Sequence, residues 1–500
     1  MAAWALCASR AHGAAWPVER EWTEEEEQAY SQWFEKLASK AWSSTNQMHH
    51  NKEYNSLYDA EDARMHYYSD CGDLPYIIRA YYAFKRRLPF VGNFISGGRY
   101  TAKGNTTSEV FDSLSHDGSA QSFFEKLTGI HSGNFRTAPE AADSFTYPIV
   151  INRQTLRPGM VFYSPNGHVA LVAECREDGT IKLADAHPDQ SVTHITFGPK
   201  LEVRSRTFSG GFRGFRKVIV KDGRAAWVRD NNALPGYSRE QYEFKDYYGS
   251  IREQLAKITI DPLVAFETYI REDTYQEALD RLQSVELAWP VGREHEIPIP
   301  PNIYDASGDW ENYSSPSRDL RLRLSCLNIP EQVRYFMRQL REHPENLVTS
   351  YKKPEELGQA QLDLKEKLFK ELSVQYTNSR GQKVTLTLND LEERLFRLSF
   401  DPNHAPELRW GATGEELKTA LTSQKRYSAN YETEQYWRNR LEKKQGEMSS
   451  KDSDNPRQIP RHDISQMIRE VIAEESGKAA PAIAQGPSAG AQASPRGKNK

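Results

Sequence analysis

Apolar side chains follow a helical period at the start of the chain, a strand-like pattern in the middle, and a helical period again afterwards. Between residues 23 and 40, aromatic residues recur every three or four positions behind a threonine and a glutamate at capping-box spacing, which predicts a helix. A second helix with a broad apolar face is predicted over residues 73–87. Pro75 fits only the first turn of that helix, so its start is expected near residues 70–72. A short helix is also predicted over 119–128, and loops over 43–55 and 92–108.

Strand-like spacing begins near Arg157. Two turn signals, Asn166-Gly167 and Glu177-Asp178-Gly179, separate short apolar runs in the manner of hairpins. The glycine-rich run 210–215 lies between two such runs, and we expect it to be a hairpin turn. Helices followed by antiparallel strands predict an α+β fold, with the helices packed on the sheet. The strands are expected over residues 159–163, 168–175, 180–184, 201–208 and 215–220.

After residue 222 the pattern is mostly helical. A proline-rich stretch, residues 297–304, is expected to break this region into two lobes. Beyond residue 446 the composition becomes polar and then rich in Ala, Gly, Pro and Ser, and residues 479–500 cannot bury enough apolar surface to fold. Helices are predicted over residues 239–257, 263–284, 330–342, 354–375, 388–398 and 431–444.

The first fifteen residues resemble the second half of a signal peptide, because a short apolar stretch precedes small residues around Ala11, Gly13 and Ala14. They lack a basic start, and the alternative is an unstructured cytosolic N-terminus. The signal-peptide interpretation predicts a periplasmic or secreted protein. The chain then divides into a signal-peptide remnant (1–15), an N-terminal helix (16–44), an α+β domain (45–222), a mostly helical domain (223–450) and a disordered tail (451–500).

Composition excludes several classes of function. The net charge of -4 is small for 500 residues, so bulk charge predicts no nucleic-acid partner. No run of about 18 apolar residues is present, so no membrane-spanning helix is expected. The four cysteines are too sparse for a disulfide framework and too far apart for a CxxC metal or redox motif. We therefore expect neither a metal nor a cofactor.

Cys71 is the first candidate for chemistry. It stands in Ser69-Asp70-Cys71-Gly72-Asp73, at the predicted start of a buried helix. A thiolate there faces free backbone N–H groups and the positive end of the helix, which lowers the thiol pKa and makes the sulfur reactive. The alternative is a small buried apolar residue, the commoner fate of an isolated cysteine.

His168 is the second candidate, at the first position of a predicted strand. A histidine fixed at the edge of a sheet can present its ring to a nucleophile on a facing helix. The alternative is a structural histidine that caps the strand, and for His168 taken by itself we favour that alternative. A cysteine at a helix start and a histidine at a strand start, about a hundred residues apart, form together a far more specific pattern.

The third candidate is Asp185, at the end of the strand that should pair with the His168 strand. A carboxylate there can accept the second ring N–H of His168, which fixes the tautomer and stabilises the imidazolium. His187 lies two residues further on and would point the same way if the strand continued. Either residue can orient the base, and we prefer Asp185.

These residues resemble a family. The runs Arg157-Pro158-Gly159-Met160-Val161-Phe162 and Gly167-His168-Val169-Ala170-Leu171-Val172 look like the two strand motifs of NlpC-type cell-wall hydrolases. Asp70-Cys71-Gly72-Asp73-Leu74 is similar to the helix start of the same enzymes, and the spacing from His168 to Asp185 is similar to that of CHAP amidases. The chain departs from the NlpC pattern in three ways: Gly-Asp follows Cys71 in place of Ser-Gly, Asp185 stands where a histidine is usual, and the segment between Cys71 and His168 is longer than usual.

The resemblance implies a papain-like domain and hydrolysis of amide bonds, usually in peptidoglycan or another peptide-bearing wall polymer. It also implies that Cys71 is the nucleophile, that His168 is its base, and that the Cys71 backbone N–H stabilises the oxyanion. We expect the helical region to position this domain against the wall or an envelope protein. Two alternatives remain open: a thiol acyltransferase of the same fold, and a scaffold in which the catalytic site has decayed.

Two further groups of side chains have less specific patterns. Tyr67, Tyr68 and Tyr76 could line a substrate groove, although we favour a role in the core. Residues 318–323 are basic on balance and could contact an anionic glycan or a peptide carboxylate, although we favour a solvated helix face. The unusual run 401–411 predicts an ordered loop, for which the sequence indicates no chemical role.

Overall fold

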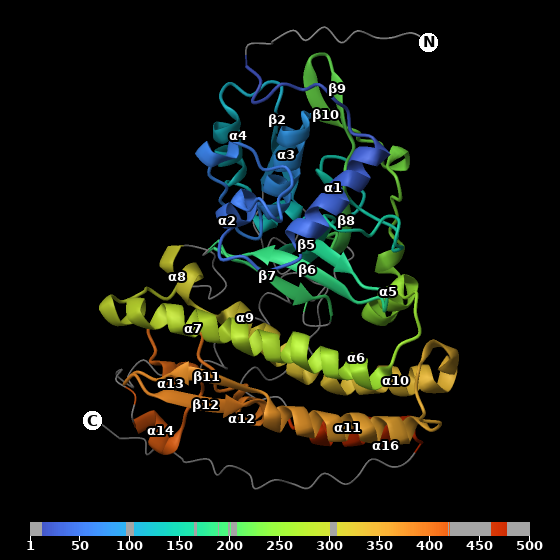
Figure 1. Ribbon diagram of the computed structural model, residues 1–500, viewed down its shortest axis with the longest axis vertical. Coiled ribbons are helices and arrows are strands. Elements are labelled where there is room, and N and C mark those ends of the chain that lie inside the picture. Colours follow the sequence, from blue (N-terminus) through green and yellow to red (C-terminus); the bar gives the residue numbers. More distant parts are fainter. Residues whose placement is uncertain are drawn as a thin grey trace, which may run out of the picture.

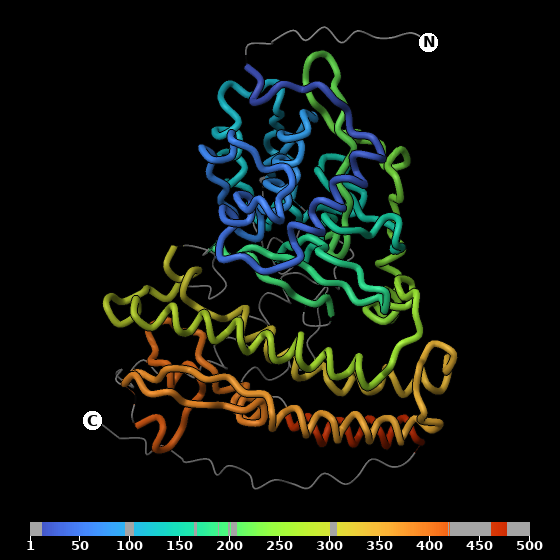
Figure 2. The backbone as a smooth tube through the Cα atoms, in the orientation of Figure 1, coloured from blue at the N-terminus to red at the C-terminus, as the bar shows by residue number. Residues whose placement is uncertain are grey.

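The protein is an α+β molecule with antiparallel sheets, seen here in a computed structural model. The structure describes residues 13–96, 105–164, 168–188, 190–198, 201, 208–300, 308–418, 420 and 462–477. Figure 1 shows the α+β half, coloured blue to green, seated on a layer of long helices coloured yellow to red. Figure 2 draws the same two halves as a backbone tube and shows the single chain segment that connects them.

The centre of the first half is a six-stranded antiparallel sheet with the strand order β3-β8-β4-β5-β6-β7. The middle strand, β5, carries the run Val169-Ala170-Leu171-Val172-Ala173, and all five side chains are buried. Such a run is typical of a strand in the middle of a covered sheet, and its side chains belong to the large apolar core of the first half. The strands are β3 (Thr146–Pro148), β4 (Val161–Ser164), β5 (His168–Cys175), β6 (Ile181–Ala186), β7 (Val192–Thr196) and β8 (Gly211–Phe215).

Two helices pack against β5, namely α1 (Glu24–Leu37) and α3 (Leu74–Arg86). Thr23 caps α1 by accepting a hydrogen bond from the Glu26 N–H, as its sequence predicts. Arg79 of α3 is buried, and it forms an ion pair with Glu27 while its guanidinium lies over the Trp22 ring. The remaining elements of this half are α2 (Thr45–His50), α4 (Ala120–Leu127), α5 (Tyr247–Leu255), the hairpins β1 (Val91–Ser96) with β2 (Thr106–Asp112) and β9 (Val218–Lys221) with β10 (Arg224–Trp227), and the short 3₁₀ turns η1 (Asp62–Arg64), η2 (Ser132–Phe135), η3 (Asn231–Ala233) and η4 (Glu240–Tyr242).

The second half begins with one long helix made of α6 (Pro262–Tyr269), the π-helical turn η5 (Ile270–Tyr275) and α7 (Gln276–Glu294). Figure 1 shows this helix lying along the sheet near β7, with α8 above it and α11, α12 and α16 below it. The other elements are α8 (Gly308–Tyr313), α9 (Pro316–Leu327), α10 (Ile329–Glu342), η6 (Pro344–Asn346), α11 (Pro354–Glu371), β11 (Ser373–Thr377), β12 (Lys383–Thr387), α12 (Leu388–Arg394), α13 (Pro406–Arg409), α14 (Gly414–Lys418) and α16 (Ile464–Glu475).

Charged contacts hold the two halves together. Glu272 of η5 lies 3.0 Å from Arg176 and 3.3 Å from Lys182, both on the sheet side. Gln339 of α10 donates a hydrogen bond of 2.7 Å to Glu253 of α5. The sheet and the helical layer therefore meet across a polar interface that reaches β7.

Several sequence predictions for the first half are wrong. The segment 43–55 contains helix α2, capped by Ser44, and the segment 92–108 contributes to the hairpin β1–β2. The run 210–215 is not a turn, since Gly211–Phe215 form the inner strand β8, where the glycines let neighbouring side chains pack closely on the sheet. Strand β7 was not predicted at all. Of the strand predicted over 201–208, residues 202–207 lie outside the described residues.

Predictions for the second half also need correction. Residues on both sides of 297–304 share one hydrophobic core, so this stretch does not separate two lobes. The tail is not wholly disordered, since α16 packs on α10 and α11, and Glu475 accepts hydrogen bonds from Arg334, Arg338 and Arg341. The predicted helix over 431–444 and most of the predicted signal-peptide remnant, residues 1–12, lie outside the described residues. Among the helices that the structure describes, none is long and apolar enough to cross a membrane.

Candidate active site

Cys71 lies in the turn that leads into α3 and is partly exposed. Asp70 organises this turn: its Oδ1 accepts hydrogen bonds from the N–H groups of Gly72 at 2.6 Å and Asp73 at 3.4 Å. Asp73 Oδ1 in return accepts from the Asp70 N–H at 2.9 Å. The helix proper starts at Leu74 with Pro75 in its first turn, as predicted, although two to four residues later than the expected start.

Gly72 keeps this turn in place by allowing two backbones to touch. A Cβ at this position would lie 2.6 Å from the His131 carbonyl carbon and closer still to the Ser132 nitrogen. Both neighbours are backbone atoms at the start of η2, so no side-chain rotation relieves the clash. The sulfur of Cys71 is therefore held in a turn that is wedged between α3 and η2.

His168 is the first residue of β5, with Ser164 of β4 as its partner across the ladder, and its side chain is 25% exposed. A chain of aromatic rings shows that this end of β5 faces the start of α3. The Tyr76 ring in the first turn of α3 lies 5.6 Å from Phe135, and Phe135 lies 6.0 Å from Tyr163 of β4. Tyr163 pairs with Val169, next to His168. The topology thus brings Cys71 and His168 to the same end of the sheet.

Asp185 lies beside the imidazole. Its side chain is fully buried on β6, and its Oδ2 is 2.9 Å from the Nε2 of His168. Because a carboxylate can only accept, this contact favours a proton on Nε2, and Nδ1 is then the nitrogen that can act as the base. Burial alone would raise the pKa of Asp185, but the charges of His187, His168 and Arg321 outweigh burial and hold this pKa well below its usual range.

His187 supports Asp185 and does not replace it. The Nε2 of His187 lies 2.8 Å from the Thr193 hydroxyl and 3.6 Å from Asp185 Oδ2. Thr193 donates its only hydroxyl proton to Asp185 Oδ1 at 2.8 Å, so His187 must donate to Thr193. Between the two candidates for orienting the base, the geometry favours Asp185. His187 lies on the far side of Asp185 and contacts it through the Thr193 hydroxyl.

The helical half adds Arg321, which the sequence did not single out. Its Nη1 lies 3.6 Å from Asp185 Oδ2, and its Nε lies 3.3 Å from Glu277 of α7. Burial would lower the pKa of Arg321, but the negative charges of Glu277, Asp185, Asp280 and the Cys71 thiolate raise it. The same guanidinium is thus within electrostatic range of the carboxylate and the sulfur of the candidate site.

The expectation of a solvated basic face over 318–323 is therefore wrong for two of its arginines. Arg321 and Arg323 are both buried, and Arg323 donates to the Leu395 carbonyl with its guanidinium near the Phe396 ring. Thr193 was missed as well, because a strand threonine carries no signal of its own. Nothing in the primary order places residue 321 beside residue 185.

The three tyrosines divide between core and surface. Tyr67 and Tyr76 are buried, and burial raises the pKa of both phenols, which fits the favoured core role. Tyr68 is 46% exposed and precedes Cys71 by three residues. Of the three, Tyr68 alone is placed to meet a substrate.

The run 401–411 is a buried structural element. His404 lies 2.7 Å from the Ser399 hydroxyl and 3.5 Å from Asp401, an arrangement that resembles a hydrolase triad. All three side chains are nearly inaccessible to solvent. Because no substrate can reach them, these three side chains form a structural element of the helical half.

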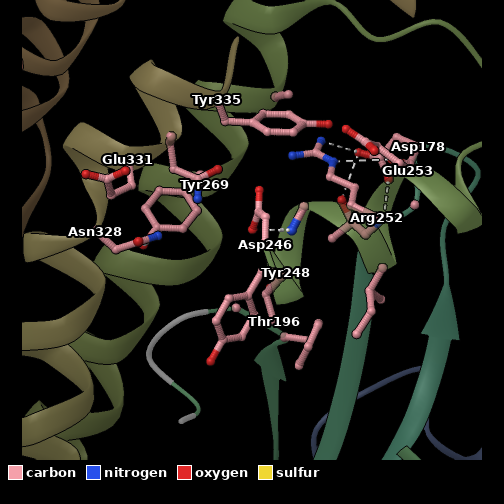
Figure 3. Close-up of a pocket in the computed structure, with 18 of the residues that line it drawn as sticks. Asp178, Thr196, Asp246, Tyr248, Arg252, Glu253, Tyr269, Asn328, Glu331 and Tyr335 are labelled. Carbon is pink, nitrogen blue, oxygen red and sulfur yellow. Dashed lines mark hydrogen bonds and ion pairs between the residues drawn. The ribbon is translucent and has the colours of Figure 1, made fainter. Parts of the chain in front are cut away.

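A separate cavity of about 530 Å³ lies between the two halves (Figure 3). Its walls carry Tyr248, Tyr269 and Tyr335 beside Asp178, Arg252 and other charged groups, and none of Cys71, His168, Asp185 or Arg321 lines it. Among the described residues, no cluster of three or more His, Cys, Asp or Glu side chains has the geometry of a metal site. Comparisons with protein families, with curated proteins and with solved structures found no match for this chain.

Proposed function

We propose that the protein is a papain-like cysteine hydrolase that cleaves amide bonds through Cys71, His168 and Asp185. The observation that carries this proposal is the contact of 2.9 Å between His168 Nε2 and the buried Asp185 carboxylate. That contact orients a partly exposed imidazole at the end of the sheet where the Cys71 turn lies. A merely structural histidine needs neither a fully buried carboxylate nor a second histidine behind that carboxylate.

The mechanism follows from the tautomer. His168 Nδ1 takes the proton from the Cys71 thiol, and the imidazolium that forms is stabilised by Asp185. The thiolate attacks the amide carbonyl carbon, and the backbone N–H of Cys71 is the expected donor to the oxyanion. The C–N bond breaks as His168 protonates the leaving amine. His168 then removes a proton from water, which cleaves the thioester and restores the thiol.

The substrate class comes from the resemblance to NlpC and CHAP enzymes, and we propose peptidoglycan peptides or another peptide-bearing wall polymer. Tyr68 supports a substrate with sugar or peptide groups, because an exposed ring beside the nucleophile offers a flat apolar contact. This function requires a periplasmic or secreted location, which the N-terminal pattern favours. It also gives the helical half a role in presenting the site to the wall or to an envelope partner.

The proposal can be tested with purified peptidoglycan. The wild type is expected to release peptide or amino-sugar fragments with new amine ends, identified by mass spectrometry, and Cys71→Ser to release none. Cys326→Ser is a matched control, because that cysteine is buried in the helical half. Digestion in the presence of an added amine distinguishes acyl transfer, which would yield amide adducts. Equal release by wild type and Cys71→Ser would refute the proposal.

A further inference from the structure

The candidate site is built from both halves of the chain. Cys71, His168 and Asp185 belong to the α+β half, whereas Arg321 reaches the same carboxylate from α9 of the helical half. Its side chain is only 9% exposed. A buried cation aimed at a catalytic carboxylate across a polar domain junction is costly unless the neighbouring charges compensate for its desolvation.

We propose that Arg321 is a positioning residue of the catalytic site, so that the helical half completes the active centre of the hydrolase. This inference rests on the proposed function and extends it. Arg321 holds the Asp185 carboxylate in its ionised form, and its positive charge favours the thiolate of Cys71 over the thiol. Without the helical half, the nucleophile and the base lose this charge.

The position of Arg321 is fixed from its other side. Glu277 of α7 lies 3.3 Å from its Nε, and Glu277 itself is buried. Asp280, one turn further along α7, adds a second carboxyl that acts electrostatically on the guanidinium. Arg321 therefore lies between two carboxylates of α7, Glu277 and Asp280, and the Asp185 carboxylate of β6, and its guanidinium is kept close to Asp185.

The contacts indicate that Arg321 positions the catalytic groups and does not block access to them. His168 keeps 25% of its side chain exposed although Arg321 lies behind Asp185, and Cys71 is also partly exposed. The charged groups that face Asp185 are His168 from β5, His187 next to β6 and Arg321 from α9. For Cys71 the corresponding groups are Asp70 and Asp73 on its own turn, His168 as the proposed base, and Arg321, which acts on it electrostatically from across the junction. Arg321 is thus the cation in this set that does not titrate near neutral pH.

The test measures Cys71 reactivity directly and needs no substrate. The rate of Cys71 alkylation by iodoacetamide is followed by mass spectrometry between pH 5 and 10 in the full chain, for the wild type, Arg321→Gln and Arg321→Lys. Loss of the positive charge should raise the apparent pKa of the thiol, so that Arg321→Gln reacts about tenfold more slowly at pH 6.5. Arg321→Lys keeps the charge and should recover most of the rate.

Two further variants separate positioning from a structural role. Arg321→Gln leaves Glu277 buried without its partner, so the double variant with Glu277→Gln removes both charges together and preserves the packing. Arg323→Gln is the matched control, since it removes a buried arginine two residues away that contacts Leu395 instead of the site. We expect the double variant to show the same shifted alkylation profile as Arg321→Gln, and Arg323→Gln to show the wild-type profile.

The outcomes are distinguishable. An unchanged profile in both Arg321→Gln and the double variant would overturn this inference, and so would an equal shift in Arg323→Gln. If the wild-type thiol itself titrates like a free cysteine, near pH 8.5, the proposed hydrolase function fails instead.

Discussion

Replacing Gly72 by alanine is a sharp test of how the nucleophile is held. The new Cβ would lie 2.6 Å from the His131 carbonyl carbon, whereas ordinary contacts begin at 3.4 Å. The two backbones must therefore separate by about 1 Å, a displacement that can cost roughly 100-fold in rate when it reaches reacting groups. Overpacking of this kind destabilises a fold by about 1–3 kcal/mol. Cys71 is the adjacent residue and moves with this turn.

Gly129→Ala is the matched control, because it changes a glycine three residues before Ser132. A Cβ there would meet the Phe94 ring and the Lys126 carbonyl at 3.4–3.6 Å, within ordinary contact distance. Urea denaturation and peptidoglycan cleavage are measured for both variants. We expect Gly72→Ala to lose about 1–3 kcal/mol and about two orders of magnitude in cleavage rate, with Gly129→Ala close to wild type. A Gly72→Ala protein as stable and active as Gly129→Ala would refute the reasoning.

Three further predictions concern titratable groups. Asp185→Asn replaces the carboxylate by an amide, so that His168 no longer meets a charged acceptor and its favoured tautomer is lost. The cleavage rate should therefore fall by roughly 10³–10⁴-fold. A loss of only a few-fold would contradict the role assigned to Asp185. Burial lowers the pKa of His49 to about 4, so its stabilising contribution is complete above pH 6.5 and is lost as the pH falls toward 4. Urea denaturation should show a decline of roughly 3 kcal/mol over that window, which is absent in His49→Gln. Burial and the nearby charge of Glu277 raise the pKa of Asp280 to about 6, so its ionisation destabilises the fold as the pH rises from 4 to 6. Asp280→Asn should therefore stabilise the protein by up to about 3 kcal/mol at pH 8 and by little at pH 4.

The sequence predicts those parts of the fold whose signals are local. The strand β5 was predicted at its observed bounds, because an apolar run between two turn signals allows few alternatives. Helices α1, α3 and α4 were predicted within a few residues for the same kind of reason, namely periodicity and a capping residue or a first-turn proline. Strand β7 was missed because its sequence, Val-Thr-His-Ile-Thr, gains its strand character from pairing with β6.

The candidate site divides in the same way. The pairing of His168 with a carboxylate on the neighbouring strand followed from hairpin spacing, and the contact with Asp185 is present. Arg321 is about 136 residues away from Asp185 in the chain, and its burial depends on how α7 and α9 pack on the sheet. Helix α16 illustrates the same limit. It is held by arginines of α10 that are distant in the sequence, and the polar residues around α16 give no sign of that packing.

The central claim is that Cys71 and His168 act as one chemical unit. The most direct measurement compares the pH dependence of Cys71 alkylation in the wild type and in His168→Ala. We predict that the wild-type thiol reacts readily well below the pKa of about 8.5 of a free cysteine, and that His168→Ala shifts the profile upward to that value. Superimposable profiles for the two proteins would contradict the account.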